Sequence, residues 1–147
     1  MNDDLVLTLT FDCSDATAQA QFWASALGYV RSPPPRGWDT WESWLVDHEV
    51  PPEEWNDGAS LMDPAGIGPR ISFLKVPEPK TAKNRLHLDL KVSGGRDVDQ
   101  DVRRTRIMAK IDDVVAAGAT ILAEHSMGDH LDHVVLLDPE GNEFCVV

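Results

Sequence analysis

Strict alternation of apolar and polar residues marks two segments of the chain as half-buried β-strands. In residues 84–92, four apolar side chains fall on one face of an extended strand. The other face carries an imidazole and a carboxylate, those of His87 and Asp89. Residues 5–12 repeat the pattern. We therefore predict one strand at each place, with an apolar face turned toward a core.

Helical spacing of apolar residues and well-placed glycines predict the other elements. Helices are expected over 16–27 and 98–117, and Gly28 and Gly118 follow them as stop signals. The remaining segments are short and bounded by glycine and proline. We predict strands at 29–31, 40–46, 59–62, 70–76, 119–123, 132–137 and 142–147, and a loop at 125–130.

The two halves of the chain have the same order of elements. Each runs strand, helix, glycine stop, strands, Asp-Pro-x-Gly turn and strand. When Thr8 is overlaid on His87 and Asp63 on Asp138, the two separations are 55 and 51 residues, a difference that one loop insertion explains. Such matched spacing is typical of an internal repeat. The sequence therefore predicts a single α+β domain, residues 1–147, made of two βαβββ modules at about 5–80 and 81–147.

Composition and charge restrict the class of partner. The chain has 147 residues, 42% of them hydrophobic and 26% charged, which is typical of one globular domain. The formal net charge is -12. A field of this sign repels phosphate backbones and anionic lipids, so neither nucleic acid nor a membrane is expected as a partner. Neutral or cationic small molecules are the expected ligands.

Cysteine content and hydropathy bear on the cellular location. The two cysteines, Cys13 and Cys145, lack the spacing of a zinc site or a disulfide scaffold. No run of about 18 apolar residues suits a membrane helix, and the first residues lack a signal-peptide pattern. We therefore expect reduced thiols and a cytoplasmic location.

Several short motifs accompany the repeat. They are Phe22-Trp23 followed by Ala26-Leu27-Gly28, then Gly118-Ala119-Thr120, the ending Asp138-Pro139-Glu140-Gly141-Asn142-Glu143-Phe144, and the run Lys83-Asn84-Arg85-Leu86-His87-Leu88-Asp89. Together with the paired modules, they resemble the vicinal oxygen chelate superfamily, and most of all its glyoxalase-like domains. That superfamily holds glyoxalase I, extradiol dioxygenases, fosfomycin resistance enzymes and bleomycin resistance proteins. The resemblance implies mixed sheets that curl around a cavity shared by the two modules.

The resemblance also implies where a metal would bind. In the superfamily, the first and last strands of each module each supply one ligand to a divalent metal. The matching positions here are Thr8, Leu74, His87 and Cys145. Leucine has no donor atom and a threonine hydroxyl is a poor ligand, so we expect no bound metal and no other cofactor. A displaced site of His87, Asp89 and Glu143 is the alternative.

Strand parity predicts which residues line the cavity. The tryptophan-rich segment 38–55 adds aromatic side chains that either stack on a ligand at the rim or fill the core. The predicted ligand-binding residues are Thr8, Thr10, Trp41, Trp44, Leu74, His87, Asp89 and Cys145. His87, Asp89 and Glu143 are the candidate catalytic acid and base groups.

Two functions follow from this site. The first is a glyoxalase-like protein that binds a small organic molecule in the cavity between the modules without a divalent metal. The alternative is an enzyme of the same fold, a lyase, isomerase or dioxygenase, that uses His87 with Asp89 or Glu143. A homodimer is expected, because sheets of this kind pair to cover their edges. The histidines at 125, 130 and 133 are expected to be solvated loop residues.

Overall fold

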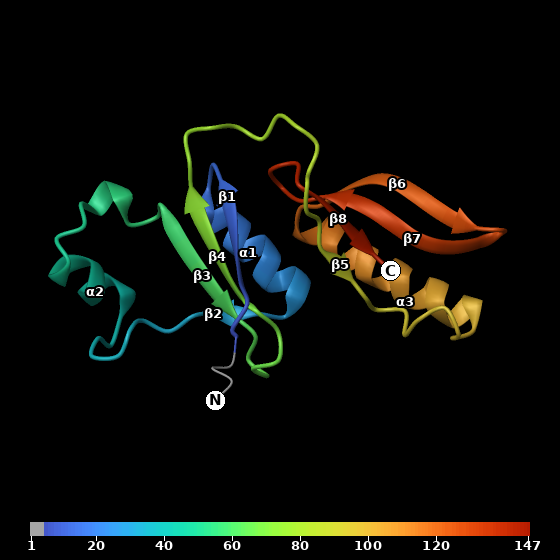
Figure 1. The fold of residues 1–147 in the computed structure, drawn as a ribbon, viewed down its shortest axis with the longest axis horizontal. Helices are drawn as coiled ribbons and strands as arrows, with labels where there is room; N and C mark the ends of the chain where they lie inside the picture. Colours follow the sequence, from blue (N-terminus) through green and yellow to red (C-terminus); the bar gives the residue numbers. More distant parts are fainter. Residues whose placement is uncertain (1–4) are drawn as a thin grey trace. The chain divides into compact units, whose positions relative to one another are not determined.

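The computed structural model describes residues 5–147 and divides into two compact units. The first unit comprises the residues up to Ala24 together with Gly28–Pro79, and the second comprises Ser25–Leu27 together with Lys80–Val147. Each unit contains one four-stranded mixed sheet (Figure 1). None of the helices in residues 5–147 is long and apolar enough to cross a lipid bilayer.

The sheet of the first unit has the strand order β1-β4-β3-β2. Strand β1 is parallel to β4, and the other neighbours are antiparallel. Two short helices lie between β2 and β3 in the sequence. The elements are β1 (Thr8–Cys13), α1 (Ala16–Leu27), β2 (Val30–Arg31), α2 (Trp41–Asp47), the 3-10 helix η1 (Pro52–Glu54), β3 (Gly58–Met62) and β4 (Arg70–Lys75).

Helix α1 covers one face of this sheet. The Asp15 side chain begins the helix by accepting the Ala18 N–H at 2.9 Å, and Gly28 ends it in the left-handed conformation at φ 70°. Phe11 of β1 packs on Trp23 of the helix, with 5.3 Å between the ring centroids, and on Phe73 of β4 at 5.4 Å. Trp23 and Phe73 are both buried. The core of the first unit therefore lies between α1 and the sheet.

The second unit repeats the topology of the first. Its sheet has the order β5-β8-β7-β6, in which the first strand is again parallel to the last. The elements are β5 (Asp89–Leu90), α3 (Gln100–Ala117), β6 (Thr120–Met127), β7 (His130–Leu137) and β8 (Glu143–Val146). Both sheets thus place their strands in the order first, fourth, third, second. This arrangement confirms the α+β class and the two βαβββ modules.

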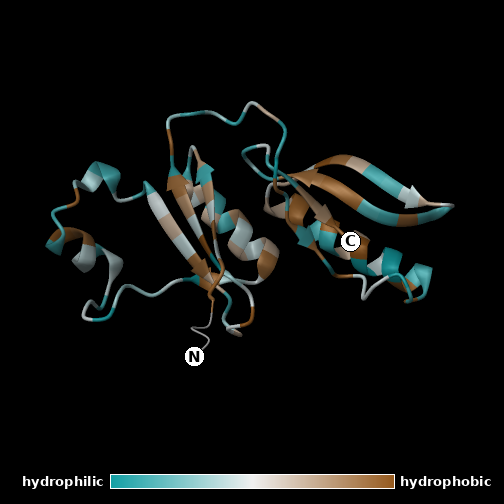
Figure 2. Ribbon diagram, viewed as in Figure 1, coloured by the Kyte–Doolittle hydropathy of each residue, from teal (hydrophilic) through white to brown (hydrophobic). Residues whose placement is uncertain are grey.

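Helix α3 packs against β7 and β8. Ile107, Ile111 and Val114 form its buried stripe, and Val134 and Leu136 of β7 are fully buried. The Asp99 side chain caps the helix by accepting the N–H groups of its first residues. Figure 2 shows hydrophobic residues on β8 and on the part of β7 beside it.

The strand predicted at 40–46 is wrong, because this segment forms helix α2. The Thr40 side chain accepts the Ser43 N–H at 3.1 Å, and the Ser43 hydroxyl reaches back to the Thr40 backbone. This reciprocal capping box fixes a helix start. Trp41, Trp44 and Leu45 then share one helix face, as residues three and four apart do in a helix.

The loop predicted at 125–130 is also wrong. Strands β6 and β7 run through it and are joined by the two residues Gly128 and Asp129, with Met127 paired to His130. Gly128 has φ 64°, which a two-residue hairpin turn requires and which glycine adopts at little cost. His125 and His133 are therefore strand residues, opposite one another with stacked rings 4.7 Å apart.

The strands predicted at 84–92 and 5–12 are shorter than the alternation suggested. β5 covers only Asp89–Leu90, and Leu86 is 69% exposed. Before β5, the Asn84 side-chain amide pairs with the backbone of Glu143, accepting its N–H at 3.2 Å and donating to its carbonyl at 3.3 Å. A side chain thus replaces the backbone pairing there. In the segment 5–12, strand β1 begins only at Thr8.

Candidate functional site

A row of hydroxyl side chains crosses the sheet of the first unit on the face away from α1. Thr10 of β1 lies opposite Ser72 of β4, and Ser72 lies opposite Ser60 of β3. The row continues to Ser32, because the Ser32 and Ser60 hydroxyls are 3.0 Å apart and the Ser32 N–H donates to the Ser60 carbonyl. We call Thr10, Ser72, Ser60 and Ser32 the hydroxyl row.

A pocket of about 390 Å³ in the first unit is built over this row. Its lining includes Thr10, Ser60 and Ser72, with Leu74 beside them on β4. The short helices supply the other walls, which are Trp41, Trp44 and Leu45 from α2, Glu54 from η1, and Trp55 immediately after it. The pocket thus combines a hydroxyl floor with aromatic walls.

The indole N–H groups of two of these tryptophans are bonded to the backbone. Trp41 donates to the Ser32 carbonyl at 2.8 Å, and Trp55 donates to the Val50 carbonyl at 2.9 Å. Trp44 meets Trp41 nearly edge-on, with 5.8 Å between centroids and 77° between planes, and His48 stacks on Trp44 at 4.2 Å. The hydrogen bonds and stacking fix the rings, so the pocket walls are formed by aromatic surface.

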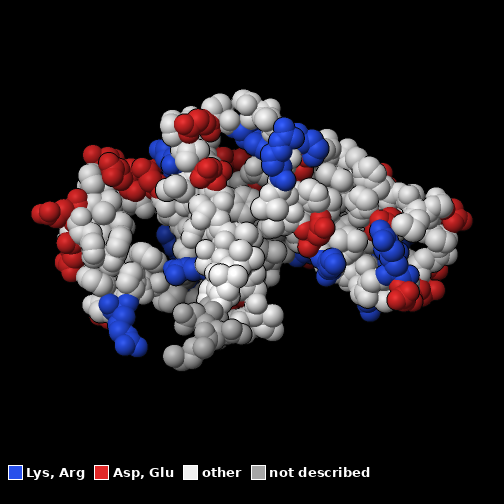
Figure 3. All heavy atoms as spheres, in the orientation of Figure 1, with Lys and Arg blue, Asp and Glu red and all other residues white. Residues whose placement is uncertain are grey.

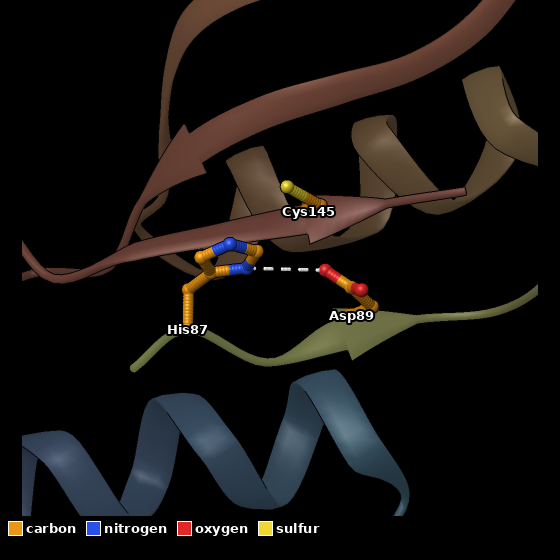
Figure 4. A group of neighbouring side chains, drawn as sticks. All are labelled: His87, Asp89 and Cys145. Carbon is orange, nitrogen blue, oxygen red and sulfur yellow. Dashed lines mark hydrogen bonds and ion pairs between the residues drawn. The ribbon is translucent and has the colours of Figure 1, made fainter. Parts of the chain in front are cut away.

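A second cluster lies in the second unit, on the parallel pair β5 and β8. Asp89 of β5 is opposite Cys145 of β8, and His87 comes two residues before Asp89 (Figure 4). The His87 Nδ1 is 3.2 Å from the Asp89 Oδ1, and one ligand atom from each of the three residues lies within 4.8 Å of the others. His87 and Asp89 are each about half exposed. Such a pair can exchange a proton with a bound molecule, with Asp89 orienting the imidazole.

The Cys145 thiol is kept neutral by its surroundings. The pKa of Cys145 is raised to about 11, first by burial and then by the charge of the Asp89 carboxylate and a hydrogen bond to it. Glu143 adds a smaller effect of the same sign, and Lys83 opposes it. A neutral thiol is a poor nucleophile, so Cys145 lacks the activation that covalent catalysis needs. Glu143 itself is ion-paired with Lys83 and lies outside the cluster of three.

Comparison with known proteins identifies the family. Residues 8–147 match the family model described as the glyoxalase-like domain, which covers nearly the whole chain. The chain belongs to the glyoxalase-like domain family. No curated protein matches its sequence.

Solved structures share the glyoxalase-like fold at low sequence identity. A glyoxalase/bleomycin resistance protein/dioxygenase family enzyme from Burkholderia phytofirmans is 18% identical, with a TM-score of 0.58 over 95% of this chain and 94% of the other. A variant of the fosfomycin resistance protein FosX from Listeria monocytogenes, complexed with Mn(II) and 1S,2S-dihydroxypropylphosphonic acid, is 9% identical, with 0.58 over 99% and 90%. The bleomycin-binding protein from Streptomyces verticillus, complexed with copper(II)-bleomycin, is 14% identical, with 0.51 over 100% and 98%. At these identities the likeness shows the fold alone.

Strand register corrects one residue of the ligand set that the resemblance implied. In the second sheet of the glyoxalase-like chain, Cys145 lies opposite both Asp89 and Val135. When Thr8 is overlaid on His87, the first-unit residue that matches Asp89 is Thr10. When Asp63 is overlaid on Asp138, the first-unit residue that matches Val135 is Ser60. The residue opposite both of those positions is Ser72. Ser72 and not Leu74 therefore occupies the place of Cys145.

This correction leaves the implied metal set incomplete. The first unit supplies only hydroxyls, from Thr8 and Ser72, which are poor ligands for divalent metals. Within residues 5–147, the one group of three His, Cys or carboxylate donors close enough to share an ion is His87, Asp89 and Cys145. The Cys145 thiol would have to lose its proton to join it. The residues therefore do not fit the metal site of the superfamily, and any displaced site would use Cys145 in place of Glu143.

The structure divides the predicted site residues between the two units. Thr10, Trp41, Trp44 and Leu74 line the pocket of the first unit, whereas His87, Asp89 and Cys145 form the cluster of the second. Thr8 is exposed and is absent from the pocket lining. The sequence analysis missed Leu45, Glu54, Trp55, Ser60 and Ser72. Trp55 belongs to the tryptophan-rich segment, so the sequence offered a reason to place it in the pocket. Ser60 and Ser72 are identified only by strand register.

We predict that Asp89→Asn lowers the pKa of Cys145 from about 11. Removing the carboxylate charge removes a cause that disfavours the thiolate, although burial still raises the pKa. The thiolate ultraviolet absorbance as a function of pH measures the change in a Cys13→Ala background, where Cys145 is the one remaining thiol. Asp129→Asn, in the exposed β6–β7 turn, is the control and should leave the pKa unchanged. An unchanged pKa in Asp89→Asn would show that Asp89 exerts no effect on the thiol.

Proposed function

We propose that this glyoxalase-like protein binds a small organic molecule in the pocket of its first unit, without a divalent metal. The observation that carries the proposal is the tryptophan-walled pocket over the hydroxyl row. Its volume of about 390 Å³ lies in the range typical of ligand sites, about 300–1,000 Å³. Ligand pockets commonly combine aromatic walls with a few polar groups that orient the ligand.

The chemistry of the lining favours a neutral or cationic ligand with an apolar or planar part. The indoles of Trp41, Trp44 and Trp55 offer stacking surface, and the hydroxyls of Thr10 and Ser72 offer hydrogen bonds from the floor. The net charge of -12 disfavours anions.

The known structures of this fold support small-molecule binding as the class of function. The Streptomyces verticillus protein is complexed with copper(II)-bleomycin, and the Listeria monocytogenes protein with a dihydroxypropylphosphonic acid. These ligands are small molecules that differ from one another in chemistry. The fold therefore supports the class of function, and the pocket residues of this chain determine its own ligand.

The second candidate is an enzyme of the same fold, a lyase, isomerase or dioxygenase. The observation that favours it is the pairing of His87 with Asp89, at 3.2 Å, beside Cys145. In such an enzyme, His87 would move a proton on the substrate and Asp89 would hold its ring. We rank this function second because both side chains are about half exposed. A general acid or base with a tuned pKa is usually shielded from water.

We predict that the fluorescence of the tryptophans changes saturably with at least one member of a panel of neutral and cationic aromatic compounds. For that compound, Trp44→Ala should raise the Kd at least about tenfold, because it removes stacking area from the pocket wall. Titration calorimetry measures the Kd of each variant.

Trp38→Ala is the matched control for this binding test. Trp38 lies in the same segment and contacts His48, but it is absent from the pocket lining. Its removal should change the Kd less than about twofold, well under the cost of losing a direct contact. Equal loss of binding in both variants would place the ligand elsewhere, and no saturable change with any compound would contradict the proposed function.

We also predict that zinc, nickel, manganese and iron(II) leave the melting temperature unchanged and do not bind at one ion per chain. The reason is that the Cys145 thiol is neutral and the hydroxyls of Thr8 and Ser72 are poor metal ligands. A tight site would raise the melting temperature through linkage. Stoichiometric binding that is lost in His87→Ala and kept in His130→Ala would contradict the metal-free function and favour the displaced site.

The homodimer expected from the sequence stays a prediction. Strand β6 ends the sheet of the second unit, and Ile121, Leu122 and Met127 on it are each about half exposed. An edge strand of this kind is a common surface for pairing with a second chain.

A further inference from the structure

We propose that the pocket of the first unit recognises an organic cation, whose alkylated ammonium group is held by the indoles of Trp41, Trp44 and Trp55 and by the carboxylate of Glu54. This inference rests on the proposed function and narrows it from small molecules in general to one chemical class.

Three tryptophan side chains lie together in the lining of one pocket. Trp41 and Trp44 meet edge-to-face, at 77° with 5.8 Å between centroids, and Trp55 lines the same pocket. An indole face carries negative quadrupolar potential and attracts a cation within about 6 Å of its centroid. Several such faces around one space are the usual site for a quaternary ammonium group.

The orientation of the rings is set before any ligand arrives. The indole N–H groups of Trp41 and Trp55 already donate to backbone carbonyls, and the His48 ring stacks on Trp44 with 25° between the planes. A side chain ordered in advance loses less entropy when the ligand binds. The bonded N–H groups are not needed to donate to the ligand, which suits a ligand group that has no hydrogen-bond acceptor.

The helical walls of the pocket carry negative charge, which attracts cations. Glu54 lines the pocket, and both short helices that form its walls carry acidic residues and no basic ones. These residues are Glu42 and Asp47 on α2, and Glu53 and Glu54 on η1. On the face of the molecule shown in Figure 3, acidic side chains gather over this segment. The net charge of -12 adds a long-range attraction for a cation.

Arg31 is the one positively charged residue in the pocket lining, and strand register places it on the other face of the sheet. It lies opposite Leu61, which lies opposite Ile71, and both of these are buried. Leu61 and Ile71 alternate with the residues of the hydroxyl row along β3 and β4. They therefore share the sheet face of Phe73, which packs on Phe11. Arg31 therefore borders the pocket at the edge of the sheet, and its side chain leaves β2 on the face of Leu61 and Ile71.

The pocket also has room for more than an ammonium group. About 390 Å³ exceeds the volume of a trimethylammonium head, and the remaining space lies over the hydroxyl row. In that row, the Ser60 hydroxyl already accepts from the Arg70 Nε at 2.8 Å. Thr10 and Ser72 are then the hydroxyls placed to bind a polar body of the ligand. The class is thus an alkylated ammonium compound with a hydrogen-bonding remainder.

The direct test compares choline with its uncharged isostere 3,3-dimethylbutanol on the full chain by titration calorimetry. The two probes have the same shape and differ in charge. We expect choline to bind at least about tenfold tighter, because a desolvated cation–π contact lowers the Kd by more than about tenfold. Glu54→Gln should remove much of the difference between the probes. Glu53→Gln, which changes the neighbouring residue outside the pocket lining, should leave it intact.

The outcomes separate this inference from the proposed function. If both probes bind equally and both need Trp44, the cation preference is overturned and the small-molecule pocket stands. If a neutral compound of the panel binds and choline does not, the inference is likewise overturned. If Glu54→Gln and Glu53→Gln weaken choline equally, the assigned carboxylate contact is overturned. If neither probe nor any compound of the panel binds, the proposed function fails as well.

Discussion

The parallel pairing of β1 with β4 determines which side chains the pocket of the first unit can use. In this register Phe11 lies opposite Phe73, and both turn toward Trp23 of α1. The residues between them, Thr10 and Ser72, must then turn to the other face. A slip of one residue would bury the hydroxyls and expose the aromatic rings. The aromatic core on one side of the sheet therefore fixes the hydroxyl floor on the other.

The same pairing in the second unit produces different chemistry. There β5 is parallel to β8, and the places of Thr10 and Ser72 are taken by Asp89 and Cys145. The backbone arrangement is shared, because both sheets have the same strand order. The residues at equivalent places differ, so one unit offers hydroxyls and indoles and the other an imidazole, a carboxylate and a thiol. The repeat thus conserves a scaffold and not a site.

Of the parts of the fold that depend on local signals, some were predicted from the sequence and two were missed. Asp15 and Gly28 bound α1 by capping, and the predicted 16–27 helix is observed. Helix α2 was missed although Thr40 and Ser43 form its capping box, because Trp41 and Trp44 were weighed as strand residues. The hairpin at Gly128 was missed because the histidines around it were read as a loop.

The candidate site was predicted only in part, for a different physical reason. Side-chain parity within a strand is visible in the sequence, so Thr10 and Leu74 were assigned to a lining face and do line the pocket. Register between strands depends on packing of the whole sheet, so the equivalence of Ser72 with Cys145 appears only in the structure. The pairing of Glu143 with Lys83 is also a tertiary contact, and Glu143 is not one of the three clustered donors His87, Asp89 and Cys145.

The most direct test of the account is a nuclear magnetic resonance titration that follows the indole N–H signals of the five tryptophans. With a saturating ligand, the account predicts that the signals of Trp41, Trp44 and Trp55 shift and that those of Trp23, buried beneath the sheet, and Trp38, outside the pocket lining, do not. Assignment comes from single tryptophan-to-phenylalanine variants. Binding that leaves the three pocket signals in place while shifting others would contradict the account.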